Sequence, residues 1–379
     1  MVGGSESLTR EIATGLARRG WDVEILTTCA VDHYTWANEL APGIAEEEGV
    51  TVRRFEVTHH WSPVTTEVQM DIQAGRRASL DKQLTWLSGR FSVPDLFLYL
   101  LVNAETYDAI VFSPYLFWTT TVCMPIVSER SVVIPCLHDE EYARLDVIRP
   151  VLSDPKALWF LSEPEHEVAH RLGPVAGHHV VTGAGINPPV GYDPGGFRRR
   201  HGLERPFALY AGRRETDKGW DWLVETFAAA VALGVPDMDL VTVGVGDVEV
   251  PPQLEGRLID LGFLSDDERD SAFAAATVYL QPSRMESFSR SVMEAWLAGT
   301  PVLAIEGSEV VAWHCRRSGG GLTFSGAEDL AAALDMFHKA PDAAAAMAAK
   351  GRAYVLEEYS WPVVLDRMEA DLEVMCRKG

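Results

Sequence analysis

Short apolar runs alternate with amphipathic segments along the whole chain. The apolar runs are typical of buried strands, and they lie at 107–112, 132–137, 157–162, 179–182, 207–210, 240–243 and 302–305. Between and after them, apolar residues at helical spacing predict helices, among them 163–172, 327–337, 343–358 and 361–376. Strands that alternate with helices in this way predict an α/β protein built on doubly wound parallel sheets.

The segment 280–305 carries the most chemical information. A strand ends at Pro282, a helix starts near Ser291, and a further strand follows the turn at Gly299. Glu286 falls in the loop and Glu294 on the helix. A helix N-terminus favours an anion such as a diphosphate, and the two carboxylates can accept hydrogen bonds from sugar and ribose hydroxyls. The alternative is an ordinary βαβ unit with two solvated glutamates.

Two cations follow the predicted strand at 207–210, in the pattern Gly212-Arg213-x4-Lys218-Gly219. Arginine offers a fork of donors to phosphate oxygens, and lysine offers a point charge. In a chain of net charge −22, two cations held at a strand end favour a bound anion, although solvated loop cations are the alternative. The glycine turn Gly244-Val245-Gly246 follows the next predicted strand. It lacks the helix that a dinucleotide fingerprint requires.

Length and composition limit the class of protein. The 379 residues, 47% of them hydrophobic and 23% charged, are enough for two globular domains. Glycine and proline density at 183–196 predicts a linker, which divides the chain into domains at 1–187 and 188–360 and a final helix at 361–379. The negative charge argues against nucleic acid as a partner. Five scattered cysteines favour a reducing cytoplasm and give no zinc pattern.

Two strand ends of the first half carry candidate residues. Tyr115, Phe117 and Trp118 follow the strand at 107–112, where they either line an acceptor site or belong to the core. His138 follows the strand at 132–137, and its place at a strand end favours a ligand-binding role over a structural one.

The string Glu-Ser-Phe-Ser…Met-Glu-Ala-Trp-Leu-Ala-Gly-Thr-Pro-Val at 286–302 resembles the Glu-x7-Glu region of retaining glycosyltransferases of family 4. The resemblance implies two Rossmann-like domains that face each other across a cleft, the B-type glycosyltransferase fold. It also implies transfer of a sugar from a nucleotide diphosphate sugar to an acceptor hydroxyl with retention, without a cofactor or an essential metal. By the same resemblance, the donor would be bound by Gly3, Gly4, Arg213, Lys218, Gly244, Glu286, Phe288, Ser289 and Glu294, and His138 would reach the sugar from the opposite domain.

The resemblance has two departures. The family's first strand precedes the Gly-Gly-x-Glu loop, whereas only Met1 and Val2 precede Gly3. We therefore expect either that Met1 is internal to a longer gene product or that the sheet lacks its central strand. The family often has glycines where this chain has Ser287 and Ser289, so backbone approach to a phosphate is more hindered unless the hydroxyls bind it.

The remaining expectations concern partners and alternative functions. The acceptor is a glycan, a lipid-linked group or a small molecule, and the basic and aromatic segment 73–102 is either ordinary surface helix or a peripheral contact with the inner face of the membrane. The Asp-Met-Asp string at 237–239 lacks supporting acidic residues, so no metal site is expected. Two alternatives stay open, a nucleotide-sugar epimerase and a catalytically silent donor-binding or scaffold subunit. The sequence does not identify the donor base, the sugar or the linkage.

Overall fold

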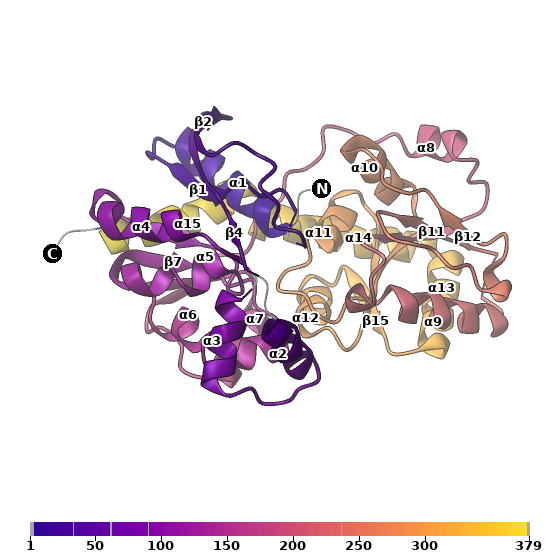
Figure 1. Cartoon of the computed structure of the whole chain (residues 1–379). Helices are drawn as coiled ribbons and strands as arrows, with labels where there is room; N and C mark the ends of the chain where they lie inside the picture. Colours follow the sequence, from indigo (N-terminus) through magenta and orange to yellow (C-terminus); the bar gives the residue numbers. More distant parts are fainter. Residues whose placement is uncertain (1–3, 33, 61–62, 90, 236, 377–379) are drawn as a thin grey trace. The chain divides into compact units, whose positions relative to one another are not determined.

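The computed structural model describes residues 4–32, 34–60, 63–89, 91–235 and 237–376. The chain forms two compact units (Figure 1). Unit 1 comprises Met1–Gly185 together with Trp361–Gly379, and unit 2 comprises Ile186–Ser360. The sequence analysis placed the domain boundary between 187 and 188, within the linker predicted at 183–196, whereas the chain divides between Gly185 and Ile186.

Unit 2 is built on a six-stranded parallel sheet. The four central strands β11, β10, β13 and β14 are fully or almost fully buried, as in sheets that helices cover on both faces, whereas the edge strands β12 and β15 are partly exposed. Their spatial order is β12-β11-β10-β13-β14-β15, so β10 and β13 pair although two strands lie between them in sequence. The direction of strand succession reverses at this pair, which makes it the topological switch point of the sheet. The strands are β10 (Phe207–Ala211), β11 (Asp239–Val243), β12 (Leu258–Asp260), β13 (Val278–Gln281), β14 (Val302–Ile305) and β15 (Gly321–Phe324).

The helices of unit 2 follow the strands in the alternation that the sequence predicts. From the sequence, the apolar stretch 258–264 is expected to be a strand. The strand β12 is shorter than this stretch and ends at Asp260. The helices are α8 (Pro194–Arg200), α9 (Trp220–Ala232), α10 (Asp266–Ala275), α11 (Arg290–Leu297), α12 (Glu309–Ser318), α13 (Ala327–Lys339) and α14 (Pro341–Glu358), with short 3-10 turns η4 (Thr216–Lys218) and η5 (Pro252–Leu254).

Unit 1 contains separate sheets. A four-stranded parallel sheet has the order β6-β7-β8-β9, and a three-stranded sheet has the order β1-β3-β2, in which β2 and β3 are antiparallel. From the sequence, residues 41–62 are expected to form a helix-to-strand connection with a strand at 50–57, and the helical part of this expectation is wrong because β2 and β3 form a hairpin. Among the described residues no strand precedes β1. The strands are β1 (Glu24–Thr28), β2 (Gly43–Glu47), β3 (Val50–Phe55), β4 (Thr58–His59), β5 (Phe91–Ser92), β6 (Ile110–Phe112), β7 (Ser131–Val133), β8 (Ala157–Phe160) and β9 (His179–Val181).

The C-terminal helix belongs to unit 1, where it lies beside the first helix (Figure 1). Trp159 donates its indole N–H to Asp371 at 2.7 Å, and Gly15 of the first helix faces Leu365. None of the described helices is long and apolar enough to cross a membrane. The helices are α1 (Gly4–Arg18), α2 (Pro63–Gln73), α3 (Leu80–Ser88), α4 (Pro94–Asn103), α5 (Trp118–Thr121), α6 (Arg149–Ser153), α7 (Glu163–Leu172) and α15 (Trp361–Cys376), with 3-10 turns η1 (Ala104–Thr106), η2 (Met124–Arg130) and η3 (Glu141–Arg144).

The basic and aromatic segment 73–102 is only partly a surface feature. Trp86 is buried and donates its indole N–H to Gln69 at 2.7 Å. Arg76 and Lys82 both lie within ion-pair distance of Asp71. These contacts favour the interpretation of α3 as an ordinary surface helix. Its tryptophan faces inward, and Lys82 and the preceding Arg76 already have an acidic partner.

Candidate functional site

A lysine and a glutamate meet at the switch point of unit 2. Lys218, in the loop after β10, donates from Nζ to Glu286 Oε1 at 2.9 Å. Glu286 lies in the loop after β13, and its side chain is 13% exposed. The two residues are 68 positions apart in sequence, and only the pairing of β10 with β13 brings them together. The carboxyl ends of parallel strands at a switch point are where open α/β sheets bind their ligands.

The loop that carries Lys218 lies directly against the end of β13. Gly219 has a φ of +74°, and a Cβ atom there would lie 2.4 Å from the carbonyl oxygen of Pro282. Only glycine fits both the left-handed conformation and the close approach. The Gly-Arg-x4-Lys-Gly spacing therefore has a local reason, because its last glycine sets the distance between the lysine loop and the glutamate loop.

Two neighbouring arginines in the same loop have different surroundings. Arg213 is partly exposed and lies 3.2 Å from Glu215. Arg214, which the sequence analysis did not single out, is buried and donates to the carbonyl oxygens of Gly244 and Gly246 at 3.0 Å each. Arg213 is thus the more accessible arginine of this loop, and its contact with a ligand stays a prediction, whereas Arg214 supports the glycine turn.

Gly244 marks a close crossing of two loops. A Cβ atom at this position would lie 2.0 Å from the carbonyl oxygen of Gly212, and the φ of Gly244 is +135°. The Gly244-Val245-Gly246 turn is therefore pressed against the first glycine of the arginine loop. This close contact explains the glycine at 244 without a ligand, so its predicted contact with the donor stays a prediction.

The start of α11 is buried and hydrogen-bonded. Phe288 is 3% exposed and packs edge-on against His314 and Tyr359. Ser289 precedes the helix with a φ of +71°, and its hydroxyl accepts a hydrogen bond from Gln281 Nε2 at 2.8 Å. The Ser289 hydroxyl is thus already held by the end of β13. The side chains of Phe288 and Ser289 are thus occupied by contacts within the protein. A ligand at these two residues would meet their backbone N–H groups.

Glu294 lies on α11 and faces α10. Its Oε1 atom is 3.9 Å from Arg269 Nη2. Burial raises the pKa of the Tyr279 hydroxyl well above its ordinary value, and the carboxylates of Glu286 and Glu294 add to this effect. Glu286 lies beside Lys218, whereas the cation nearest to Glu294 in the described contacts is Arg269.

Unit 1 assembles a second group of polar side chains around His138. His138 Nδ1 lies 3.5 Å from Glu140 Oε1, and the same carboxylate oxygen accepts the hydroxyl of Tyr115 at 2.8 Å. Burial, followed by the Glu140 carboxylate, raises the pKa of Tyr115 well above its ordinary value, so this hydroxyl stays a neutral donor. The sequence analysis placed Tyr115 and His138 at neighbouring strand ends but did not identify Glu140 as their common partner.

A buried glutamate holds the loop that carries His138. Glu165, on α7, accepts the backbone N–H of Leu137 through Oε1 at 2.6 Å and the N–H of Leu161 through Oε2 at 2.5 Å. Burial raises the pKa of Glu165 to about 8, although the backbone donors act in the opposite direction. Leu137 immediately precedes His138, so this carboxyl group fixes the backbone from which the histidine projects.

The structure brings neither Phe117, Trp118 nor Gly4 into the polar group around His138. Trp118 is buried in the core, which favours the core interpretation over an acceptor role, and Phe117 packs edge-on against Trp36 at 5.2 Å. Gly3 lies outside the described residues. Gly4 is the first residue of α1, and a Cβ atom there would meet no other atom within 4 Å. Steric crowding within the described structure therefore does not require glycine at position 4.

Part of unit 2 matches a known protein family, and part of the chain matches curated enzymes. Residues 205–339 match the family described as glycosyl transferases group 1. A 2-deoxystreptamine glucosyltransferase from Streptomyces kanamyceticus is 35% identical over 118 residues, which cover 28% of this chain and 30% of that protein. The chain thus matches about a third of the length of its curated relatives. Both members of the Lys218–Glu286 pair fall inside the segment that matches the family.

Solved structures show the same fold over the whole chain. Sucrose-phosphate synthase from Thermosynechococcus elongatus has a TM-score of 0.73 at 20% identity, with 98% of this chain and 94% of that chain covered. HepE from Anabaena, in complex with UDP and glucose, has a TM-score of 0.70 at 17% identity, with 99% and 97% covered. The two-unit α/β architecture is therefore the B-type glycosyltransferase fold, as the sequence predicted.

Proposed function

We propose that this protein is a retaining glycosyltransferase of family 4, which transfers a sugar from a nucleotide diphosphate sugar to an acceptor hydroxyl. The observation that carries the proposal is the Lys218–Glu286 pair at the switch point between β10 and β13. A cation for phosphate oxygens and a carboxylate for sugar hydroxyls lie side by side, at the edge of the sheet where ligands bind in such folds.

The donor would be held by unit 2. Lys218 and Arg213 bind the diphosphate, and the N-terminus of α11 adds the backbone N–H groups after Glu286. Glu286 accepts hydrogen bonds from the sugar hydroxyls, and Glu294 from the ribose. Since Glu286 also orients Lys218 at 2.9 Å, one carboxylate both binds the sugar and positions the cation.

The reaction exchanges one bond at the anomeric carbon for another. The bond from this carbon to the diphosphate oxygen breaks, and a bond to the acceptor oxygen forms on the same face. The acceptor proton passes to the departing phosphate oxygen. The protein contributes positioning and electrostatic stabilisation, with the charges of Lys218 and Arg213 set against the negative charge that develops on the leaving group. His138 would contact the sugar from unit 1, oriented by Glu140.

The donor to test first is a uridine diphosphate hexose. Support comes from the matched glucosyltransferase and from the complex of HepE with UDP and glucose. The acceptor would be a glycan, a lipid-linked group or a small molecule met in the cytoplasm, with or without peripheral membrane contact. Because Lys218 and Arg213 supply the cationic groups, we propose that no metal ion is required for donor binding.

The experiment is a thermal-shift panel of nucleoside diphosphates and their sugars, with magnesium and with a chelator. A ligand at a hundred times its dissociation constant stabilises a protein by about 2.7 kcal/mol, which is readily measured. We compare the wild type with Lys218→Ala and with Lys350→Ala, whose lysine is exposed on α14 of the same unit. One nucleotide series should stabilise the wild type and Lys350→Ala, independently of magnesium, and Lys218→Ala much less.

Turnover with the identified donor then tests the role of Lys218 in the reaction. Removal of one group that stabilises developing charge costs about 10²–10³ in kcat, so Lys218→Ala should lose at least about two orders of magnitude. Activity of this variant within about threefold of the wild type would contradict the assignment. Nucleotide binding with no transfer to any acceptor tested would favour the scaffold alternative.

A further inference from the structure

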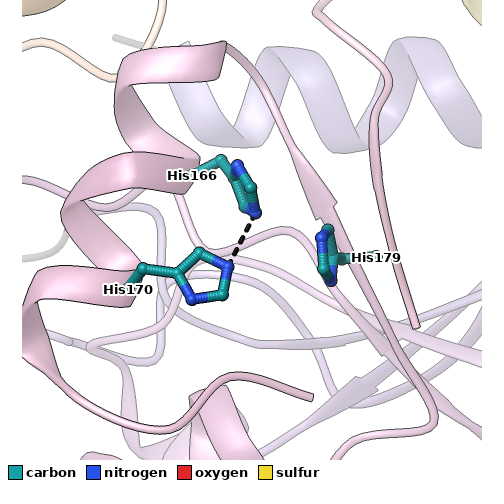
Figure 2. A group of neighbouring side chains, drawn as sticks. All are labelled: His166, His170 and His179. Atoms are coloured by element: carbon teal, nitrogen blue, oxygen red, sulfur yellow. Dashed lines mark hydrogen bonds between the residues drawn. The ribbon is translucent and has the colours of Figure 1, made fainter. Parts of the chain in front are cut away.

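Three histidines outside the proposed donor site converge in unit 1. Figure 2 shows His166 and His170 on one face of α7, with His179 on the neighbouring strand β9. His166 Nε2 and His170 Nε2 are 2.8 Å apart, and the ring centroids of His166 and His179 are 4.6 Å apart. One ligand-type nitrogen from each ring lies within 4.8 Å of the others.

The separations are close to those of a zinc site. With Zn–N bonds of about 2.0–2.1 Å, tetrahedral geometry places two ligand nitrogens about 3.4 Å apart. The pair on α7 is slightly closer than this at 2.8 Å, and the nitrogen of His179 lies within 4.8 Å of both. Small rotations of the side chains are enough to reach the zinc geometry, because His170 is exposed and the other two rings are only partly buried.

The surroundings of the rings also resemble those of metal-ligating histidines. His179 Nδ1 lies 3.3 Å from the carbonyl oxygen of Ala176, so a proton on Nδ1 leaves Nε2 unprotonated. His166 Nδ1 lies 3.9 Å from the carboxylate of Glu163. In metal sites the second nitrogen of a ligating histidine commonly donates to a backbone carbonyl or carboxylate, which fixes the ring and its tautomer.

The sequence contains a signal that the sequence analysis overlooked. Residues 166–170 read His-Glu-Val-Ala-His, and histidines four positions apart on a helix lie on one face, as in the zinc-binding pattern His-Glu-x-x-His. The third histidine is nine positions farther along the chain and reaches the same place only because β9 lies beside α7. The group contains no cysteine, so the spacing of the cysteines gives no indication of it.

We propose that His166, His170 and His179 form a binding site for a divalent transition-metal ion of the zinc class, which joins α7 to β9. Three imidazole nitrogens suit zinc, cobalt, nickel or copper, and they leave a fourth position for water or another ligand. The site shares no residue with the proposed donor site, which uses residues of unit 2 together with His138. Binding of the metal can therefore be measured without any transferase reaction.

The competing explanation is a metal-free histidine cluster. Two neutral imidazoles can share one hydrogen bond, and the 2.8 Å contact between His166 and His170 fits that arrangement as well. A hydrogen bond explains the pair but gives no role to His179 in the group. The proposal is distinguished by its requirement for all three rings, including the one on β9.

The experiment uses the full chain without a histidine tag, freed of metal with a chelator. Zn²⁺ is titrated against a chromophoric competitor, and Co²⁺ binding is followed by its visible absorption, which reports tetrahedral geometry. The variants are His170→Asn on α7 and His179→Asn on β9. His338→Asn is the matched control, because His338 is exposed on α13 of unit 2. Circular dichroism establishes that each variant is folded.

We expect one tightly bound Zn²⁺ per chain in the wild type and in His338→Asn. Each of the other variants should lose more than about tenfold in affinity, since even residues that only orient a ligand cost about 10–100-fold when they are removed. Because His170 is exposed, its replacement leaves the core intact, so a loss of affinity there reports the site. Zn²⁺ affinity unchanged in either His170→Asn or His179→Asn, or no Zn²⁺ binding by the wild type at micromolar concentration, would overturn the proposal.

Discussion

Glu165 should make the stability of unit 1 depend on pH. Its carboxyl group is completely buried, and burial raises its pKa from 4.5 to about 8. In the unfolded chain the same group is solvated and loses its proton near its ordinary pKa. Between these two values the folded state therefore binds a proton that the unfolded state does not. The free energy of unfolding must fall as pH rises through this window.

The size of the effect follows from the difference between the two pKa values. One pH unit corresponds to about 1.4 kcal/mol, so the change from 4.5 to about 8 corresponds to about 5 kcal/mol. The stabilisation is fully present below pH 4.5 and is lost by about pH 8. Cys136 belongs to the same environment, since burial and then the Glu165 carboxylate raise its pKa to about 12. Its thiol is therefore neutral throughout the window.

The perturbation is Glu165→Gln, which keeps the shape of the side chain and removes its titration. We would measure urea unfolding of the wild type and the variant from pH 5 to pH 9, with hydrogen exchange at the Leu137 and Leu161 amides as the local readout. Glu167→Gln is the control, because Glu167 is exposed on the same helix. The wild type should lose stability relative to Glu165→Gln as pH rises, whereas Glu167→Gln should follow the wild type. Parallel profiles for the wild type and Glu165→Gln would refute the reasoning.

Three further predictions concern unit 2. Gly244→Ala should destabilise it by more than about 3 kcal/mol in urea unfolding, because the new Cβ atom would lie 2.0 Å from a backbone oxygen at positive φ. Ser289→Gly should leave nucleotide affinity nearly unchanged in calorimetry, since the lost hydroxyl faces Gln281; a large loss would mean that it binds phosphate. Glu215→Gln should raise nucleoside diphosphate affinity by up to about fivefold, because a carboxylate 3.2 Å from Arg213 no longer competes with the ligand, and weaker binding would contradict this.

The sequence predicted unit 2 well because its strands and the loops that follow them can be recognised from short stretches of sequence. Strands β10, β11, β13 and β14 are largely apolar and buried, and Arg213 and Lys218 lie in the loop that follows β10, so position alone indicates the edge of the sheet. Arg213 and Lys218 could be found in this way. The contact of Lys218 with Glu286 could not, because it depends on which strands pair, and β10 pairs with a strand about 70 positions away.

Unit 1 was predicted less completely because its important contacts join distant segments. Glu165 is an ordinary helix residue by its sequence, and nothing near it indicates that its carboxyl group holds the backbone at Leu137. The hydroxyl of Tyr115 meets Glu140 only after two loops fold together. The hairpin of β2 and β3 was missed because the polar strand β2 has an exposed burial pattern and no apolar run.

The buried Glu165 carboxyl group and the histidine cluster both involve helix α7, on different sides of it. Glu165 and His166 are neighbours on α7, so their side chains diverge by about 100° around the helix axis. Glu165 reaches Leu137 and Leu161, whereas His166 and His170 face β9. A metal ion at the histidines would fix α7 against β9, and the Glu165 carboxyl group fixes α7 against the loop of His138. Because both contacts act on α7, we expect loss of the metal, or loss of the Glu165 hydrogen bonds in Glu165→Gln, to loosen the loop that carries His138. Hydrogen exchange at Leu137 measures this directly, with and without Zn²⁺, and protection that responds to neither change would separate α7 from the placement of His138.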